Sequence, residues 1–211
     1  MMPAIAAPRT RAPGGLGRLG YDLDTLLTVA VRVFNERGYD GTSMGDLARA
    51  LGISKSSIYH HVAGKSELLR LATDRALDAL FAVTQEPAAA QGPAIERLQH
   101  VIRRSVEVLV AELPYVTLLL RVRGNTTVER RALTRRRELD AHVASLVLAA
   151  SREGALRADV DPALTSRLVF GTVNSLVERY RPSRGPAVPA LADAVLQMVL
   201  DGLRTPGGEP S

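Results

Sequence analysis

The sequence contains no cysteine and no tryptophan. The absence of cysteine excludes disulfide frameworks, cysteine-ligated zinc sites and catalysis by a thiol. No apolar run approaches the roughly 18 residues that a membrane-spanning helix needs. Residues 1–20 also lack the apolar core of a secretory signal. We therefore expect a cytoplasmic protein with no membrane partner.

Aromatic residues are scarce, while alanine, leucine, valine and arginine are abundant. This composition favours helices over sheets, so the expected fold class is all-α. A chain of 211 residues is long enough for one or two domains with a hydrophobic core. Its formal charge of +5 permits a polyanionic partner, although charge alone does not identify one.

No motif in the sequence indicates catalysis. There is no glycine-rich phosphate loop, no pair of metal ligands at a functional spacing and no nucleophile motif. His60 and His61 are adjacent, so on a helix their side chains point in different directions and do not easily share a metal. We expect no enzyme activity, no metal site and no cofactor.

Residues 42–65 indicate two short helices joined by a tight turn. Apolar residues at helical spacing give each helix one buried face, namely Leu47, Ala48, Leu51, Ile58 and Val62. Thr42 or Ser43 is placed to cap the first helix, and Ser54 to cap the second. Gly52 stands where a helix end commonly needs a left-handed residue. The pattern predicts a helix-turn-helix.

The second helix of this pair carries polar side chains on its outer face. Short polar and charged groups near the start of such a helix reach base edges and phosphates in a major groove. Lys55 and Lys65, the only lysines of the chain, both lie beside it. The expected DNA contacts are Thr42, Ser43, Ser54, Lys55, Ser56, Ser57, Tyr59, His60 and Lys65. The alternative is an ordinary helical hairpin with a polar face.

The run GYDGTSMGDLARALGISKSSIYHHVAGKSELL, residues 38–69, strongly resembles the DNA-binding segment of TetR-family transcriptional regulators. The resemblance implies a three-helix DNA-binding head on a larger helical body that binds a ligand and dimerises. Gly45 departs from a good helix, because glycine inside a helix costs about 0.5–1 kcal/mol relative to alanine.

The expected organisation has four parts. Residues 1–20 form a disordered basic arm, 21–66 the head, 67–205 the body and 206–211 a disordered tail. The arm either touches phosphates or a minor groove, or is a solvated tail without a role. Within the head, the first helix is expected to begin after Asp22.

A loop is expected at 87–93. Near the C-terminus the sequence predicts two helices, at about 162–180 and 187–204. Both are apolar on more than one face. The first has a second face of leucines and small residues, made of Leu164, Leu168, Gly171 and Ser175. We predict a two-fold homodimer whose four-helix interface uses these helices.

Residues 121–137 hold seven arginines against one acid, Glu129. Such a run is usually a solvated face; the alternative is an entrance for an anionic ligand, since guanidinium forks suit phosphates. Residues 123–140 and 170–185 resemble the C-terminal domain of TetR-type repressors of fatty-acid, steroid or phenylacetate catabolism, which respond to acyl-CoA thioesters. The expected ligand contacts are Leu118, Arg121, Arg123, Arg130, Phe170, Asn174 and Glu178, and helix–helix hydrogen bonds or a salt bridge are the alternative for Asn174 and Glu178.

The leading interpretation is a ligand-responsive repressor, bound as a dimer to a palindromic double-stranded operator and released by an inducer, an acyl-CoA thioester. Three alternatives remain. One is a repressor of a drug-efflux gene that senses hydrophobic drugs. The second is an enzyme acting on CoA esters. The third is a sequence-tolerant structural DNA binder, which would need little chain beyond the head.

Overall fold

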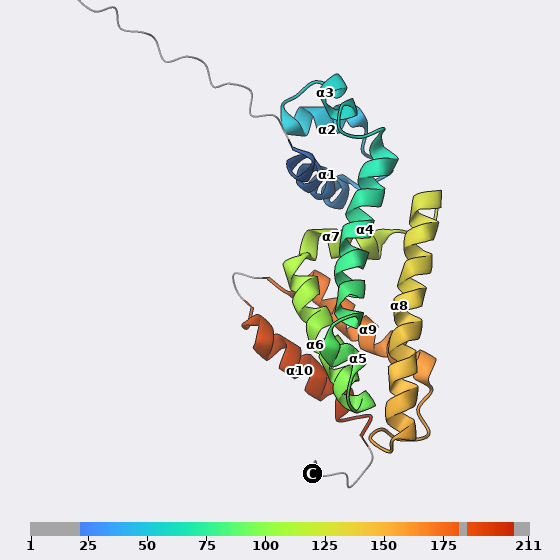
Figure 1. Ribbon diagram of the computed structural model, residues 1–211. Coiled ribbons are helices and arrows are strands. Elements are labelled where there is room, and N and C mark those ends of the chain that lie inside the picture. Colours follow the sequence, from blue (N-terminus) through green and yellow to red (C-terminus); the bar gives the residue numbers. More distant parts are fainter. Residues whose placement is uncertain (1–21, 182–184, 205–211) are drawn as a thin grey trace, which may run out of the picture.

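The computed structural model describes residues 22–181 and 185–204, which fold into ten α-helices. An isolated bridge between Leu156 and Arg204 is the one β pairing among these residues. The prediction of an all-α protein is confirmed. Figure 1 shows a small head at one end of a longer helical body, with α4 running from one into the other. The predicted arm (1–20) and tail (206–211) lie outside the described residues.

Local capping sets the helices of the head, α1 (Leu23–Arg37), α2 (Met44–Leu51) and α3 (Lys55–Tyr59). Asp22 accepts a hydrogen bond from the amide of Thr25 at the start of α1. Ser43 and Asp46 form a reciprocal capping box on α2. Gly52 ends α2 in the left-handed conformation, with φ 68° and ψ 27°, as the sequence predicts.

The three head helices share one core. The two helices of the predicted turn contribute Leu47, Leu51 and Ile58, all buried. Side chains of α1 fill the space behind them, with Leu26 and Phe34 almost fully covered. Val62 is also buried, although α3 ends before it at Tyr59. Helix α3 and the residues after it are therefore held against the head by the buried Ile58 and Val62.

The body begins with α4 (Lys65–Thr84). The remaining helices are α5 (Pro87–Ala90), α6 (Ala94–Ala111), α7 (Leu113–Arg121), α8 (Thr127–Arg152), α9 (Pro162–Arg179) and α10 (Val188–Leu200). The loop expected at 87–93 contains α5, because a proline at the first helical position followed by alanines suits one turn of helix. The last helix ends at Leu200 rather than near residue 204.

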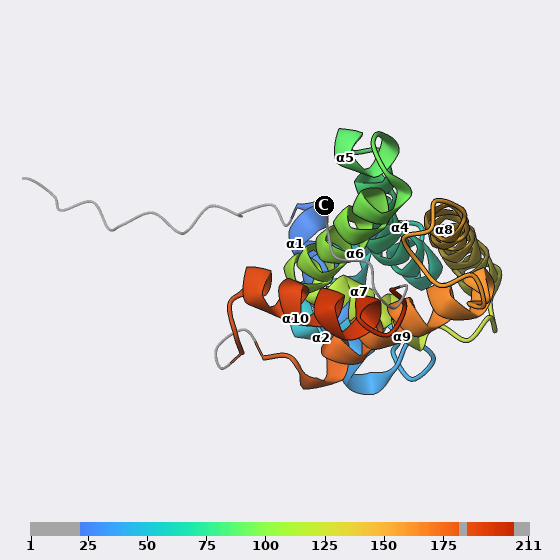
Figure 2. The same cartoon turned by 90° about the horizontal axis from the view of Figure 1, so that it is seen from below.

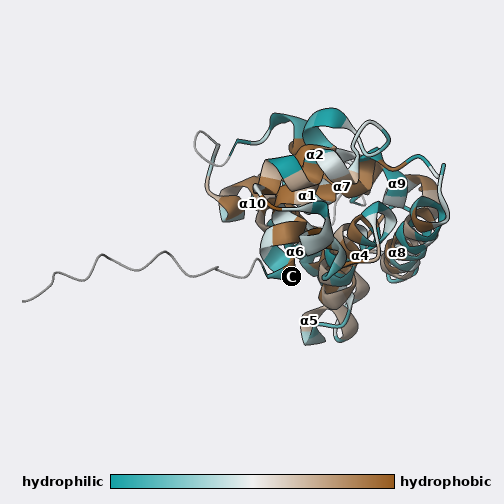
Figure 3. Ribbon diagram, turned by 90° about the horizontal axis from the view of Figure 1, so that it is seen from above, coloured by the Kyte–Doolittle hydropathy of each residue, from teal (hydrophilic) through white to brown (hydrophobic). Residues whose placement is uncertain are grey.

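Helix α4 is the central helix of the body. The helix packs on α6, α7 and α8, while α9 packs on α8 and α10 packs on α6. Figure 2 shows α9 and α10 along one side of the body, with α5 on the opposite side. In Figure 3 the visible part of α10 is coloured mainly as hydrophobic. No helix in the described ranges is long and apolar enough to cross a membrane.

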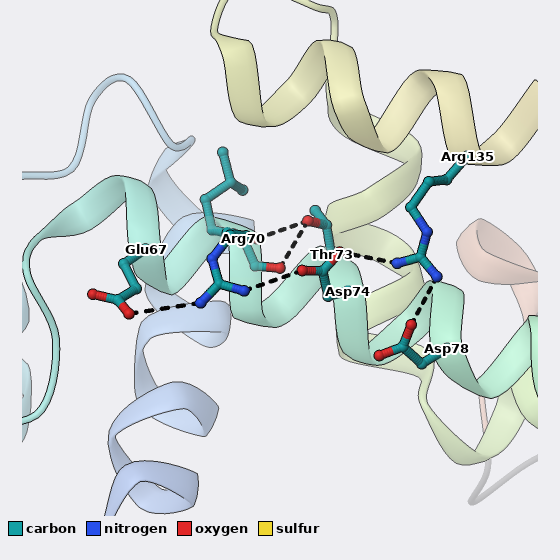
Figure 4. Close-up of polar contacts among 7 residues, drawn as sticks. Glu67, Arg70, Thr73, Asp74, Asp78 and Arg135 are labelled. Carbon is teal, nitrogen blue, oxygen red and sulfur yellow. Dashed lines mark hydrogen bonds and ion pairs between the residues drawn. The ribbon is translucent and has the colours of Figure 1, made fainter.

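Ion pairs join α4 to α8, the helix that carries most of the arginine run (Figure 4). Arg135 donates to Asp74 at 2.9 Å and to Asp78 at 2.7 Å. Arg70 lies on the other side of Asp74, at 3.3 Å, and 3.6 Å from Glu67. Arg135 is therefore a structural link between two helices and does not belong to a solvated face.

Candidate functional site

The outer face of α3 presents hydroxyls, a lysine, a tyrosine and a histidine. The Ser54 hydroxyl accepts from the Ser57 amide at 3.1 Å and lies 2.8 Å from the hydroxyls of Ser56 and Ser57. Tyr59 exposes 52% of its surface although it is a large aromatic residue. His60, at the C-terminal end of α3, is also exposed. These side chains form a polar surface. Within the described residues their hydrogen bonds are confined to the helix and its cap.

Gly45 has a local explanation in the position of Lys55. A Cβ atom added to Gly45 would lie 3.0 Å from Cε and 3.4 Å from Nζ of Lys55. The glycine in α2 thus lets the lysine stem lie close along the neighbouring helix. The departure from good helix propensity coincides with the placement of a charged residue that is predicted to contact DNA.

Two of the predicted DNA contacts are less available than the sequence indicates. Thr42 is buried, and its hydroxyl donates to the carbonyl of Gly38 at 2.7 Å. Its side chain is not presented to DNA, so that prediction is wrong for Thr42, whereas the neighbouring Ser43 is exposed. Lys65 donates to the carbonyl of Tyr39 at 2.8 Å, and its Nζ lies 4.3 Å from the centre of that ring. The ammonium retains two further donors.

The body contains an apolar pocket enclosed by α4, α6, α7, α8 and α9. Its walls are Leu80, Ser105, Leu109, Val116, Leu119, Leu120, Arg136, Leu139, Asp140, Phe170, Val173 and Asn174. Phe170 and Asn174 were both predicted from the sequence as ligand contacts. The cavity volume is about 30 Å³, which is about the volume of one water molecule. A larger molecule enters only if the walls move apart.

Arg136 brings a charge into this apolar pocket. Within the described ranges its guanidinium makes no hydrogen bond and no ion pair within 4 Å. Burial lowers the pKa of Arg136, and Asp140 on the next turn of α8 partly opposes that shift. Burial also raises the pKa of Asp140. An arginine stays protonated despite such a shift, so the pocket is lined by a cation with unused donors and also by Asn174.

A surface hollow of about 450 Å³ adjoins the pocket. Arg121, Asn174 and Glu178 were all predicted as ligand contacts, and they line it together with Thr117, Leu120, Val177 and Arg181. Leu120 and Asn174 line both the hollow and the pocket. The structure thus brings four of the seven predicted ligand residues to one connected region.

The other three predicted ligand residues do not reach the apolar pocket. Leu118 and Arg123 line a separate hollow of about 470 Å³ between head and body, which Arg121 also borders. Arg130 donates to the carbonyls of Gly124 and Asn125 and closes the loop before α8. The structure therefore does not bring these three residues to the apolar pocket, and their role as ligand contacts stays a prediction.

Three side-chain contacts join α1 of the head to α7 of the body. Thr28 Oγ1 lies 3.2 Å from the hydroxyl of Tyr115. Asn35 Nδ2 donates to the carbonyl of Pro114 at 2.8 Å. Arg121 donates to the backbone carbonyl of Asn35. Since α7 also supplies Val116, Leu119 and Leu120 to the pocket, one helix touches both the pocket and the head.

Tyr115 also connects this joint to α4. Arg75 places its guanidinium carbon 4.2 Å from the centre of the Tyr115 ring and donates to the hydroxyl at 3.3 Å. The same arginine pairs with Glu112 at 2.7 Å, and this hydrogen bond is the largest cause of the raised pKa of Arg75.

In residues 22–181 and 185–204 no group of three His, Asp or Glu side chains is arranged to hold a metal ion.

Two family models match the chain. Residues 26–72 match bacterial regulatory proteins of the tetR family, and residues 91–203 match the tetracyclin repressor-like C-terminal domain. The second match alone covers more than half of the sequence. The two models fall on the head and on the body with the pocket, respectively.

Individual relatives agree with the family models. The transcriptional repressor KstR2 of Rhodococcus jostii (strain RHA1) is 30% identical over 86% of this chain and 90% of its own. A crystal structure of a TetR-family member from Streptomyces coelicolor A3 has 61% identity and a TM-score of 0.81, covering 86% of this chain and 92% of that one. AibR, solved with isovaleryl coenzyme A and operator DNA, shares the fold, with 22% identity and a TM-score of 0.73 over 84% of this chain and 97% of its own.

Proposed function

The chain belongs to the TetR family of bacterial transcriptional regulators and is not an enzyme, and on that premise we propose that it is a dimeric repressor released from a palindromic operator by an acyl-CoA thioester. The observation that carries this proposal is the position of α7. One face of this helix lines the apolar pocket and its ends are bonded to the first helix of the head. A displacement of α7 at the pocket would therefore also move its contacts with α1 of the head.

The DNA-binding part of the proposal rests on α3. Lys55, Tyr59 and His60 are exposed, whereas Ile58 of the same segment is buried. A tyrosine hydroxyl and a lysine ammonium suit phosphate oxygens, while the serines at the helix start are short enough to approach base edges. The chain's excess of basic residues adds a sequence-independent attraction to DNA.

The dimer rests on an exposed apolar surface of α9 and α10. Leu164 and Leu168 on α9 are 49% and 63% exposed, and Met198 on α10 is 64% exposed. The predicted second face of α9 continues with exposed Gly171 and Ser175, whose small size allows close approach of another helix. Apolar patches of this kind mark interfaces, and a two-fold axis would pair the patch with its own copy.

The effector part rests on the size and chemistry of the pocket. A cavity of about 30 Å³ does not hold a metabolite, so binding selects a state in which the walls, α7 included, are displaced. An effector that binds this state better than the closed one shifts the population away from the DNA-competent arrangement. The apolar walls suit an acyl group, and Arg136 with Asn174 offers donors to a thioester carbonyl.

A sensor of hydrophobic drugs is the second candidate. Its supporting observation is the apolar lining of the pocket. Phe170 is the one aromatic side chain in that lining, and Asp140, the one carboxylate, lies beside Arg136 on α8. A cationic drug would meet the Arg136 charge, so this pocket favours a ligand with a carbonyl or an anionic group.

The test begins with selection of binding sites from a random DNA pool by the purified protein. An inverted repeat is the expected product. Tyr59→Ala is then expected to weaken binding to that site, and Lys55→Ala to reduce the slope of log affinity against log salt by about 1. Arg152→Ala, which removes an exposed charge at the far end of α8, is the control. Recovery of no inverted repeat, or full affinity in Tyr59→Ala, would contradict the proposal.

Acyl-CoA esters are then added to the protein–DNA complex. Fluorescence anisotropy of the labelled operator should fall with a thioester and stay high with the matching free acid. Release by hydrophobic cationic drugs alone would instead favour the second candidate.

A further inference from the structure

The buried pocket and the surface hollow beside it share two lining residues, Leu120 of α7 and Asn174 of α9. The pocket is apolar apart from a few groups, whereas the hollow is bordered by two arginines, Arg121 and Arg181, and one carboxylate, Glu178. An apolar pocket therefore adjoins a hollow with an excess of positive charge. This arrangement matches a molecule that is apolar at one end and anionic at the other.

Both arginines have donors to spare. Arg181 uses one nitrogen, Nη1, to donate to the carbonyls of Glu178 and Tyr180, at 3.1 and 3.0 Å. Arg121 uses one nitrogen, Nη1, to donate to the carbonyl of Asn35. Since a guanidinium has five N–H donors in a planar fork, each arginine can bind a phosphate oxygen. Glu178 is exposed and its single charge does not cancel the two cations.

We propose that the pocket and the hollow form one two-part effector site, in which the pocket receives the acyl chain, the hollow receives the phosphate-bearing end of the same thioester, and the bound anion draws Arg121 away from the Asn35 carbonyl. This inference rests on the proposed function and assigns its effector a binding mode. Arg121 is then the positioning residue that the effector and the head share.

The competition for Arg121 follows from charge. A guanidinium–phosphate pair is a charge-assisted hydrogen bond and is stronger than a bond to a neutral carbonyl. The Asn35 carbonyl lies near the C-terminal end of α1, where the last carbonyls lack partners inside the helix. Loss of the Arg121 contact removes one of three side-chain links between α1 and α7. The effector thus has different contacts in the two states, as coupling between sites requires.

The test compares two thioesters of the same acyl chain, one with and one without the phosphate-bearing nucleotide arm. Octanoyl-CoA carries the phosphates, and S-octanoyl-N-acetylcysteamine carries the same acyl thioester without them. Isothermal titration of the full-length protein should show tighter binding of octanoyl-CoA. Arg121→Gln and Arg181→Gln should each weaken octanoyl-CoA binding about tenfold, as expected for one lost charge-assisted contact. Binding of the neutral thioester should stay within twofold of the wild-type value.

Two matched variants complete the design. Arg131→Gln removes an exposed charge of the same run, away from the hollow, and should leave both affinities unchanged. Arg121→Lys keeps the charge without the planar fork and should recover only part of the octanoyl-CoA affinity. Without any thioester, Arg121→Gln should already bind the selected operator more weakly than Arg131→Gln does, because the contact to Asn35 is lost.

The outcomes separate this inference from the proposed function. Equal affinity of the wild type for the two thioesters, or an unchanged preference in Arg121→Gln and Arg181→Gln, would overturn the two-part site while operator binding still supports a repressor. Failure of octanoyl-CoA to bind would overturn it as well. Failure to select an inverted repeat would count against the repressor itself, whatever the thioester data show.

Discussion

Asn35, in the last turn of α1, donates from Nδ2 to the carbonyl of Pro114 in the first turn of α7, at 2.8 Å. The two residues belong to the head and to the body, and they are 79 positions apart in the sequence. The Oδ1 atom of Asn35 is buried and has no hydrogen-bond partner among the described residues. At this joint one half of the Asn35 amide is therefore bonded and the other half is unsatisfied.

Asn35→Ala is the first prediction. The variant removes one partly exposed hydrogen bond and also the unsatisfied oxygen, so the free energy of unfolding should change by about 1 kcal/mol or less. Operator affinity should fall more clearly, because the orientation of α1 on α7 is less restricted. Asn125→Ala, an exposed asparagine in the loop before α8, is the control. Chemical denaturation and anisotropy measure the two effects; equal operator affinity in both variants would contradict the role given to this joint.

The head was predicted well because its determinants are local. Ser43, Gly52 and Ser54 act within a single turn of their own helices, and a short apolar pattern fixes which face is buried. Thr42 was the exception. Its hydroxyl bonds the carbonyl of Gly38, four residues earlier, and a sequence pattern does not distinguish such a buried threonine from an exposed one.

Which side chains line the pocket depends on the rotation of each helix about its axis. In α7 the apolar residues run almost all round, so the sequence does not tell that Leu119 and Leu120 face the pocket while Leu118 faces the head. In α8 a signal was present and was missed. Arg136 lies on the same helical face as the buried Leu139 and Val143, whereas Arg130 does not.

A second prediction concerns acid and the capping box of α2. Hydrogen bonds from the Ser43 side chain and backbone, followed by one from Arg49, lower the pKa of Asp46 from 3.8 to about 2. A carboxyl group whose pKa is lower in the folded state stabilises the fold at any pH above its unfolded-state pKa. That stabilisation is lost as the pH falls through the folded-state pKa. Asp46→Asn should therefore be less stable than the wild type at neutral pH.

The difference should shrink between pH 4 and pH 2, the interval that the two pKa values of Asp46 define. Urea denaturation at a series of pH values measures it. Asp24→Asn is the control, because Asp24 in the first turn of α1 is exposed and accepts no hydrogen bond within the described chain. A stability difference that stays constant down to pH 2 would show that the Asp46 carboxylate charge contributes nothing to the cap.

The third prediction concerns the bonds between α8 and α4. Arg135→Ala leaves Asp74 without its partner from α8, and that carboxylate is only 18% exposed. Removing hydrogen bonds to a charged group lowers the free energy of unfolding by roughly 1.5–3 kcal/mol. Because Asp78 is exposed, we expect a value near the lower end of that range. The melting temperature should fall by about 2–4 °C per kcal/mol in a chain of this length.

Arg131→Ala is the matched control for Arg135→Ala, since it removes an exposed arginine from the same helix. Arg135→Met adds a second comparison, because it retains the apolar stem near the Phe81 ring, 5.2 Å from the Arg135 guanidinium carbon. A melting temperature for Arg135→Ala equal to that of Arg131→Ala would mean that the α4–α8 ion pairs are screened by solvent.

The last prediction concerns Leu168, which is 63% exposed on α9. A residue near a two-fold axis is buried twice in the dimer, and each leucine contributes about 1.5–3 kcal/mol when fully buried. Leu168→Glu also places two like charges at the interface, so the dimer dissociation constant should rise at least about 100-fold. Analytical ultracentrifugation measures this change.

Leu148→Glu, at an exposed leucine of α8, should leave the dimer intact. Because each half of a palindrome needs its own α3, monomers of Leu168→Glu should bind operator weakly while single half-site affinity is retained. A stable Leu168→Glu dimer would place the interface elsewhere on the body.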